Sequence, residues 1–155
     1  MKSLEQCVQA LLFSVGGDGN LLLNVGPMPD GRIEPRQVER LREMGKWVEK
    51  YGDGVQGTRG GPFKPDQKWG VSTCKSNEIY LFVMKWPDEG PLRLPAITMK
   101  IKTSKALSGG KVTVTQTDSG VLVDVSPEDR ADIATVIKLT VDGDAFEIKP
   151  VDVVK

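Results

Sequence analysis

One short stretch near the start of the chain decides the fold: NLLLNVGP, residues 20–27. Its apolar residues follow one another without alternating with polar ones, and Gly19 and Pro27 bound it. A continuous run of this kind is typical of a strand buried on both faces, as in a parallel sheet. Helical patterns lie on either side of it. The sequence therefore predicts helix, buried strand and helix over residues 1–51.

The two flanking helices have clear apolar faces. Residues 3–15 begin with Ser3 and Gln6, which fit a capping box, and glycines follow the segment. Residues 35–51 begin with Pro35, which suits the first helical position. The apolar side chains of the first helix recur at helical spacing: Leu4, Cys7, Val8, Leu11, Leu12 and Val15.

The second half of the chain changes to a period of two after a connector rich in glycine and proline at residues 52–68. Turn residues separate short apolar-polar runs, which predicts an antiparallel β-sandwich. The fold class is thus α+β by composition: a helix-strand-helix unit, followed by an antiparallel β-sandwich. The predicted strands are 69–74, 78–86, 92–95, 97–102, 111–117, 120–125, 135–141 and 145–149.

The first half looks incomplete because a parallel strand needs partners on both edges. Unpaired N–H and C=O groups beside leucines invite aggregation, and each buried unpaired group costs about 1–3 kcal/mol. We therefore expect residues 1–51 to be the last unit of a larger α/β barrel, supplied by a longer chain or by a partner. The alternative is that residues 20–25 simply join the sandwich sheet.

The run GNLLLNVGPMPDGRIEP, residues 19–35, resembles the last barrel strand and following loop of the α-L-fucosidases of glycoside hydrolase family 29. The similarity continues through residues 39–47 and 51–59, so it covers residues 3–60 at the level of sequence. The rest of the chain resembles the family only in its predicted architecture. That family has a catalytic (β/α)8 barrel followed by a C-terminal β-sandwich. The resemblance implies that residues 1–60 are the end of the barrel and residues 61–155 the sandwich domain.

The resemblance also implies exo-hydrolysis of α-L-fucosides with retention of configuration. Such chemistry uses two carboxyl groups about 5–5.5 Å apart, one as nucleophile and one as acid/base. In the family, these groups and the histidines that hold the sugar come from earlier barrel strands, and this sequence has no histidine. We therefore expect no catalytic residue, metal or cofactor here, and a chain that is inactive alone.

Two alternatives to a supporting part of a fucosidase stay open. One is a carbohydrate-binding sandwich, and the other is a non-catalytic interaction subunit that completes a split barrel on another chain. The partners expected are a fucosylated glycan when the barrel is complete, and a second chain or a second copy covering the exposed strand. Family members are often secreted, periplasmic or lysosomal, but the compartment of this protein is left open.

Composition excludes several classes of protein. The 21 Lys and Arg balance 21 Asp and Glu, so no basic excess is present to bind nucleic acid. The absence of histidine argues against the usual serine and cysteine triads and against imidazole zinc sites. No apolar run approaches the ~20 residues of a membrane-spanning helix. The first residues suit an amphipathic helix better than a signal peptide.

The two cysteines, Cys7 and Cys74, are too few for a disulfide scaffold. They could pair, but free cysteine commonly behaves as a small core residue. We therefore expect two buried free thiols.

Three residues are candidates for binding substrate. Asn24 lies at the C-terminal end of the predicted barrel strand, the end at which barrel active sites form. It could bind a sugar hydroxyl, although a structural role in holding a loop is favoured. Trp69 and Trp86 could stack on a sugar ring, although core packing is favoured for both. The acidic residues around Glu128 read as a surface turn rather than a catalytic pair or a calcium site.

Overall fold

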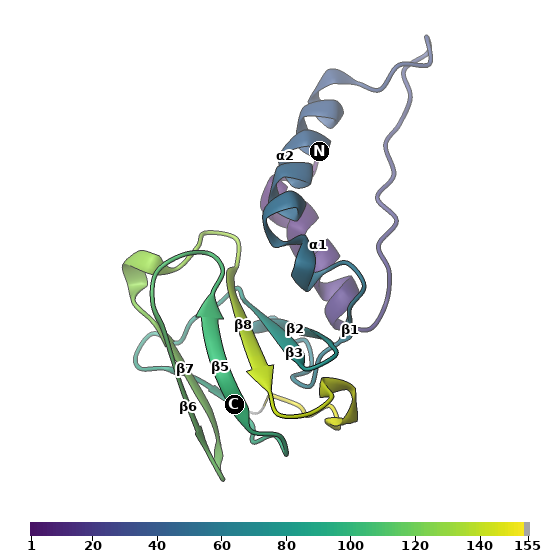
Figure 1. Ribbon diagram of the computed structural model, residues 1–155. Coiled ribbons are helices and arrows are strands. Elements are labelled where there is room, and N and C mark those ends of the chain that lie inside the picture. Colours follow the sequence, from purple (N-terminus) through teal and green to yellow (C-terminus); the bar gives the residue numbers. More distant parts are fainter. Residues whose placement is uncertain (154–155) are drawn as a thin grey trace.

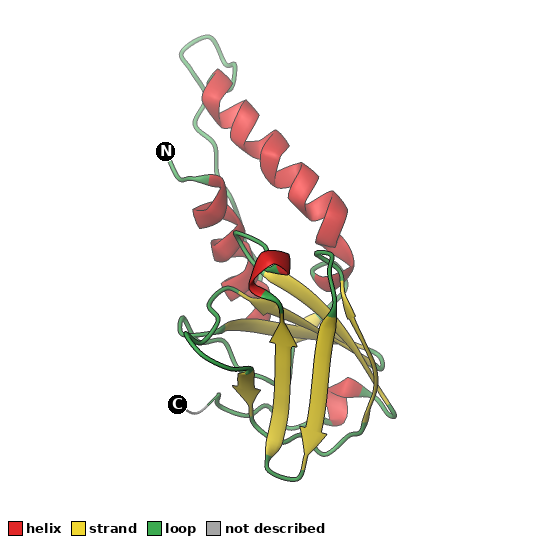
Figure 2. Cartoon of the chain, turned by 90° about the vertical axis from the view of Figure 1, so that its left-hand side faces the viewer, coloured by secondary structure: helices red, strands yellow, loops and turns green. Residues whose placement is uncertain are grey.

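Residues 1–153 are described by a computed structural model, in which two helices, a five-stranded sheet and a three-stranded sheet form three successive layers (Figure 1). The helices and the loop between them project to one side of the two sheets (Figure 2). The chain thus contains a sandwich with a helical layer on its outer face. The predicted α+β fold class is confirmed.

Both predicted helices form. Helix α1 spans Leu4–Gly16, and its first turn is closed by the predicted capping box. Ser3 Oγ accepts a hydrogen bond from the Gln6 amide at 3.1 Å, while Gln6 Oε1 accepts one from the Ser3 amide at 2.9 Å. Helix α2 spans Pro35–Tyr51 and continues into a 3-10 turn, η1, at Gly52–Gly54.

The sandwich is built from antiparallel pairs throughout. The five-stranded sheet has the order β1-β2-β3-β8-β5, and the three-stranded sheet has the order β4-β7-β6. The predicted sandwich is therefore confirmed. Its strands are β1 Arg59–Gly60, β2 Gly70–Lys75, β3 Glu78–Val83, β4 Leu92–Leu94, β5 Ile101–Ala106, β6 Val112–Thr117, β7 Gly120–Val125 and β8 Thr135–Val141.

Two predicted strands are wrong. The strand expected at 97–102 begins only at Ile101, as β5, and continues to Ala106. The strand expected at 145–149 is instead a 3-10 turn, η3, at Ala145–Glu147. The carboxylate of Asp144 caps this turn by accepting a hydrogen bond from the Phe146 amide at 3.0 Å. A local side-chain bond of this kind competes with strand pairing.

The central strands of the five-stranded sheet, β2, β3 and β8, are buried along most of both faces. On β3, Ile79, Leu81 and Val83 face the three-stranded sheet, whereas Tyr80 and Phe82 belong to the cluster under the helices. Successive side chains of a strand point to opposite faces, so one strand serves two cores. The second core joins the sheet to both helices, and its buried members are Val8, Leu12, Trp47, Tyr51, Val71, Tyr80, Phe82, Ala134 and Val136. The predicted division at residue 60 stays a prediction.

The strand predicted at residues 20–25 is not formed. Residues 17–34 run as a long loop beside α1 and α2 (Figure 1), and none of the strand pairings within residues 1–153 involves 20–25. The alternative that these residues join the sandwich sheet is wrong as well. The segment keeps one property of a strand: Leu21, Leu23 and Val25 are partly buried, while the residues between them are exposed.

Both cysteines are free and buried, as predicted. No helix among the described residues is long and apolar enough to cross a membrane.

Candidate functional site

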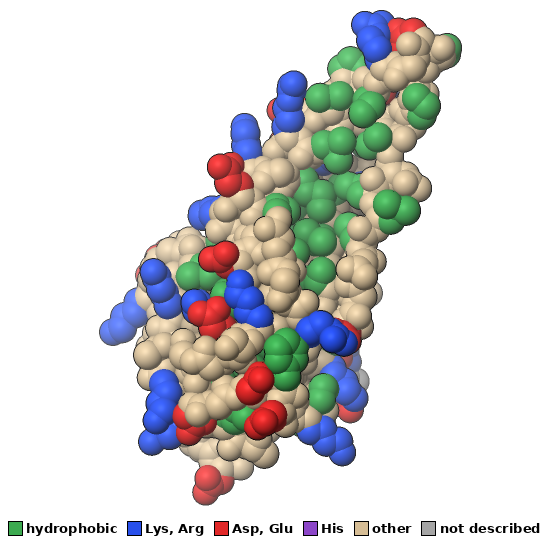
Figure 3. All heavy atoms as spheres, turned by 45° about the vertical axis from the view of Figure 1, so that its right-hand side comes forward, with side chains coloured by type: hydrophobic (Ala, Val, Ile, Leu, Met, Phe, Trp, Pro, Cys, Tyr) green, Lys and Arg blue, Asp and Glu red, His purple; other side chains and the backbone are tan. Residues whose placement is uncertain are grey.

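Hydrophobic side chains gather on one side of the helical layer, between the helices and the loop that joins them (Figure 3). From the loop, Leu23 and Val25 line the space between the loop and the helices, and the neighbouring Leu22 is 85% exposed. We call this surface, made of residues 21–25 with Leu41 and lying over the buried Cys7, the open face. A surface leucine exposed to this degree within a gathering of apolar side chains marks a contact surface.

A cavity of 440 Å³ lies beneath the open face, between the N-terminal halves of α1 and α2 and residues 23–25. Cys7, Leu23, Val25 and Leu41 supply its apolar lining. The side of α2 supplies charged and polar groups. Apolar side chains of the loop and the helices therefore approach one another without closing the space between them.

The end of the 20–25 segment is held to α2 by one polar contact. Gln37 Oε1 accepts a hydrogen bond from the Gly26 amide at 3.0 Å. Asn24 lines the cavity with its neighbours but is exposed, and its side chain makes no hydrogen bond within residues 1–153. Its amide is therefore available to a ligand or to a neighbouring chain segment.

Two of the charged side chains that line the cavity, Arg36 and Arg40, are paired with glutamates, and Lys2 lines it as well. Arg36 Nε lies 2.6 Å from Glu34 Oε1, and Arg40 Nη1 lies 2.8 Å from Glu43 Oε2. The Arg36 guanidinium lowers the pKa of the Glu34 carboxyl. Glu34 is the one carboxylate in the cavity lining, whereas a retaining glycosidase needs two about 5–5.5 Å apart. This cavity therefore holds no complete catalytic pair.

The two tryptophans offer little ring surface to a sugar. Trp69 is 2% exposed in the sandwich core, and its indole N–H donates to the Lys64 carbonyl at 3.2 Å. Trp86 is partly buried, with the Arg130 guanidinium 4.4 Å from its ring centroid and its N–H directed to Thr135 Oγ1 at 3.3 Å. A glycan-binding role for either residue stays a prediction.

The acidic residues near Glu128 form a short 3-10 turn, η2, at Pro127–Asp129, with no buried member. Within residues 1–153 no three His, Cys, Asp or Glu side chains come close enough to hold a metal ion. The turn is a solvated surface feature, in line with the favoured interpretation of its sequence.

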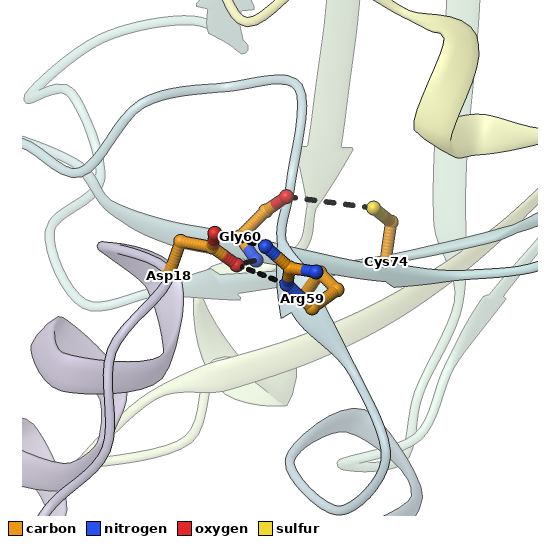
Figure 4. Close-up of polar contacts among 4 residues, drawn as sticks. All are labelled: Asp18, Arg59, Gly60 and Cys74. Carbon is orange, nitrogen blue, oxygen red and sulfur yellow. Dashed lines mark hydrogen bonds and ion pairs between the residues drawn. The ribbon is translucent and has the colours of Figure 1, made fainter.

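A polar junction connects the end of α1 to the first strand of the sandwich (Figure 4). Asp18 follows α1 and accepts hydrogen bonds from the Arg59 side chain and from the Gly60 amide. The Gly60 carbonyl in turn accepts a bond from the Cys74 thiol at 3.5 Å. Sequence reasoning missed this junction, because nothing in a single sequence pairs residues 41 positions apart.

Cys74 makes the stability of the protein sensitive to alkaline pH. Burial, together with the carboxylates of Asp144 and Asp18, raises the pKa of the Cys74 thiol to about 11 from 9.0. As pH rises, the unfolded chain releases this proton before the folded protein does, so stability is full below about pH 9 and falls between pH 9 and 11. We therefore expect the urea concentration at the unfolding midpoint to be lower at about pH 10 than at about pH 8.

The control for this prediction is Cys74→Ala, which removes the thiol but leaves Tyr80, whose pKa is also raised by burial. The loss of stability between the two pH values should be smaller in this variant than in the natural protein. Equal losses in the two proteins would contradict the assignment to Cys74.

A family model described as Alpha-L-fucosidase matches residues 1–53. The α-L-fucosidase of Branchiostoma floridae is 41% identical over 95 residues, which cover 59% of this chain and 21% of that protein. The human tissue α-L-fucosidase is 30% identical over 147 residues, which cover 88% of this chain and 31% of that protein. The chain thus spans about a fifth to a third of the length of these relatives.

Solved structures agree with these matches. An α-L-fucosidase GH29 from Bacteroides thetaiotaomicron aligns with a TM-score of 0.80 at 26% identity, over 95% of this chain and 33% of that one. The Thermotoga maritima α-fucosidase aligns with a TM-score of 0.74 at 30% identity, over 90% of this chain and 35% of that one. These matches are all to glycoside hydrolases. They show that the chain corresponds to a part of the α-L-fucosidases of family 29, about a fifth to a third of their length.

Proposed function

We propose that this chain is the C-terminal supporting part of a retaining α-L-fucosidase. It completes a catalytic barrel with residues 20–25 and carries that barrel on the sandwich. The single observation that supports the proposal most is the unpaired state of residues 20–25, which form most of the open face and border the cavity beneath it. A sequence this apolar is expected to pair with neighbouring strands.

The alternation of burial along this segment agrees with a barrel strand. Leu21, Leu23 and Val25 lie on the side of the helices and are partly buried, while Leu22 and Asn24 are exposed. In a barrel, alternate side chains of each strand face the surrounding helices and the interior. Leu22 would therefore fill the interior of the completed barrel.

Asn24 would face the interior too, two residues closer to the C-terminal end of the strand. Active sites of such barrels form at this end. The Asn24 amide can both donate and accept hydrogen bonds, and no group within residues 1–153 occupies it. We infer that it contacts the substrate or a loop that holds the substrate.

The proposed substrate is an α-L-fucoside at the end of a glycan, cleaved with retention of configuration. The two carboxyl groups of such a reaction would come from the rest of the barrel, whether on the same polypeptide or on another. Residues 1–153 support the reaction by closing the barrel and by presenting Asn24. The chain alone is expected to be inactive because its open-face cavity has one carboxylate, already paired with Arg36.

A chromogenic aryl α-L-fucoside tests both halves of the proposal. The purified chain is expected to show no hydrolysis above the rate of buffer. A chimera in which this chain replaces the matching third of the Thermotoga maritima enzyme, 35% of its length, is expected to hydrolyse the substrate. The control is the same enzyme with the matching part deleted, which should be inactive.

Turnover by the purified chain would refute its predicted inactivity. A chimera that is folded and monodisperse but inactive would contradict the supporting role. Circular dichroism and size-exclusion chromatography of the chimera establish that it is folded before its activity is compared.

A further inference from the structure

The ion pair between Asp18 and Arg59 joins the helical layer to the sandwich. Arg59 Nε lies 2.7 Å from Asp18 Oδ1, and Arg59 Nη2 lies 2.6 Å from Oδ2 (Figure 4). The Gly60 amide donates to Asp18 Oδ1 at 2.9 Å. Three donors on β1 thus converge on one carboxylate, in the two-pronged geometry that gives arginine its directional preference.

No other ion pair of the described residues has this placement. Asp30 and Arg32 lie in one loop, the pairs on α2 and at its start are local, and the Lys138–Glu78 pair joins two strands of one sheet. Lys64 and Asp152 lie in segments outside the helices. Among the ion pairs within residues 1–153, Asp18–Arg59 is the one that connects the helical layer with a strand.

Asp18 is also the residue at which the chain leaves α1. Its φ angle is 63°, in the left-handed region that aspartate tolerates better than most residues. The amides of Asp18 and Gly19 still bond to the last turn of α1, at 3.1 Å to Val15 O and 2.8 Å to Ser14 O. The chain therefore turns at Asp18 and then enters the segment that bears Asn24.

The strand approaches this turn as closely as its backbone allows. A Cβ atom on Gly60 would lie 3.0 Å from the Gly16 carbonyl oxygen and 3.1 Å from the Asp18 Cβ. A side chain at position 60 would press the strand away from the end of α1. The close packing that glycine allows at position 60 and the three hydrogen bonds to Asp18 hold β1 against the turn at the end of α1.

We propose that Asp18 and Arg59 are a positioning pair: together they fix, relative to the sandwich, the point from which residues 20–25 enter the barrel, and so set which side chains face its interior. This inference rests on the proposed function. A slip of one residue along a strand exchanges its two faces. In this segment, such a slip would turn Leu23 and Val25 inward in place of Leu22 and Asn24.

The pair does not act through overall stability. The side chains of Arg59 and Asp18 are 66% and 45% exposed, and ion pairs this exposed contribute little to the free energy of unfolding. Their loss should leave the fold intact and release only the turn. This separates a positioning role from a merely structural one.

Hydrogen exchange of the chain itself tests the anchoring. In Asp18→Asn, which tolerates the same backbone conformation, we expect the Gly19 and Gly60 amides to exchange at least about tenfold faster by NMR, since both are bonded at the junction. Amides of β3 should exchange as before. The matched control is Asp30→Asn, which removes an equivalent carboxylate from a local pair with Arg32 and should change neither amide.

Turnover of the chimera tests the positioning. Because molecules with a slipped segment would be inactive and the rest unaltered, Asp18→Asn should lower kcat about tenfold at unchanged KM and nearly unchanged Tm. Arg59→Lys keeps the charge but loses the bidentate geometry, so its kcat should lie between that of the natural chimera and that of Asp18→Asn. A variant that loses kcat only in proportion to a lower folded fraction would show a structural role and overturn the proposal.

The two measurements separate this inference from the proposed function. Unchanged exchange at Gly19 and Gly60 overturns the positioning role whether or not the chimera is active. Faster exchange with full turnover overturns it as well, while the supporting role of the chain stands. Faster exchange in the Asp18→Asn chain, together with an unmutated chimera that is inactive, would support the anchoring. It would count only against the proposed function.

Discussion

Replacing Phe82 with alanine is expected to lower the free energy of unfolding by about 3–5 kcal/mol. Phe82 is 0% exposed on β3, and its ring centroid lies 6.2 Å from that of Trp47 on α2. The 3-10 turn after α2 also packs tightly against the Phe82 ring, because a Cβ on Gly54 would lie 2.8 Å from it. Removing the ring opens a cavity between the sheet and both helices, which a rigid sheet cannot close.

Urea denaturation followed by tryptophan fluorescence measures the loss. The control is Phe146→Ala, the same change at a phenylalanine that is 51% exposed, for which we expect a change within about 0.5 kcal/mol. A loss below about 1 kcal/mol for Phe82→Ala would mean that the helical layer does not depend on the sheet for its place. Similar losses in the two variants would mean that the second core is not packed as described.

The helices and most strands could be predicted from local sequence because the signals that specify them are local. Ser3 and Gln6 cap α1 within its own first turn, and Pro35 begins α2. The period of two in β3 places Tyr80 and Phe82 on one face of the sheet and Ile79 and Leu81 on the other, as the structure shows. Each of these features depends on residues a few positions apart.

The errors have the opposite origin. Residues 20–25 have the composition of a buried strand, but a strand exists only where another strand supplies hydrogen bonds, and none within residues 1–153 does. Residues 145–149 have a plausible strand pattern, but the Asp144 side chain stabilises a turn at their start. In both places the strand propensity of the sequence is overridden by hydrogen-bond partners that a local pattern does not contain: a missing neighbouring strand in one and the Asp144 side chain in the other.

The candidate site could be predicted only in part for the same reason. Asn24 is found from its position after an apolar run, and its exposure agrees with a free amide. For Trp69 and Trp86 the sequence favours core packing, but it does not show the contacts that their rings make with the Lys64 carbonyl and Arg130. The partner of Asp18 lies 41 residues away, beyond a helix and a connector, so its identity is fixed by the tertiary fold alone.

Leu22→Asp is expected to separate folding from assembly. In the isolated chain the Leu22 side chain is 85% exposed, so the free energy of unfolding should change by less than about 0.5 kcal/mol. In the chimera with the Thermotoga maritima barrel, the same aspartate would lie in the barrel interior. Burying an unpaired carboxylate costs several kcal/mol, and each 1.4 kcal/mol is about a factor of ten, so turnover should fall at least about a hundredfold.

The control is Leu22→Met, which keeps the volume and the apolar character and should cost less than about 1.5 kcal/mol. Urea denaturation of the chain and fucoside hydrolysis by the chimera are measured for both variants. Full activity with aspartate at position 22 would show that this side chain does not enter a barrel, and the supporting role would lose its main argument. Destabilisation of the isolated chain would show instead that Leu22 already packs within it. Loss of activity with an unchanged chain is the one result that requires the open face to be covered by strands from elsewhere.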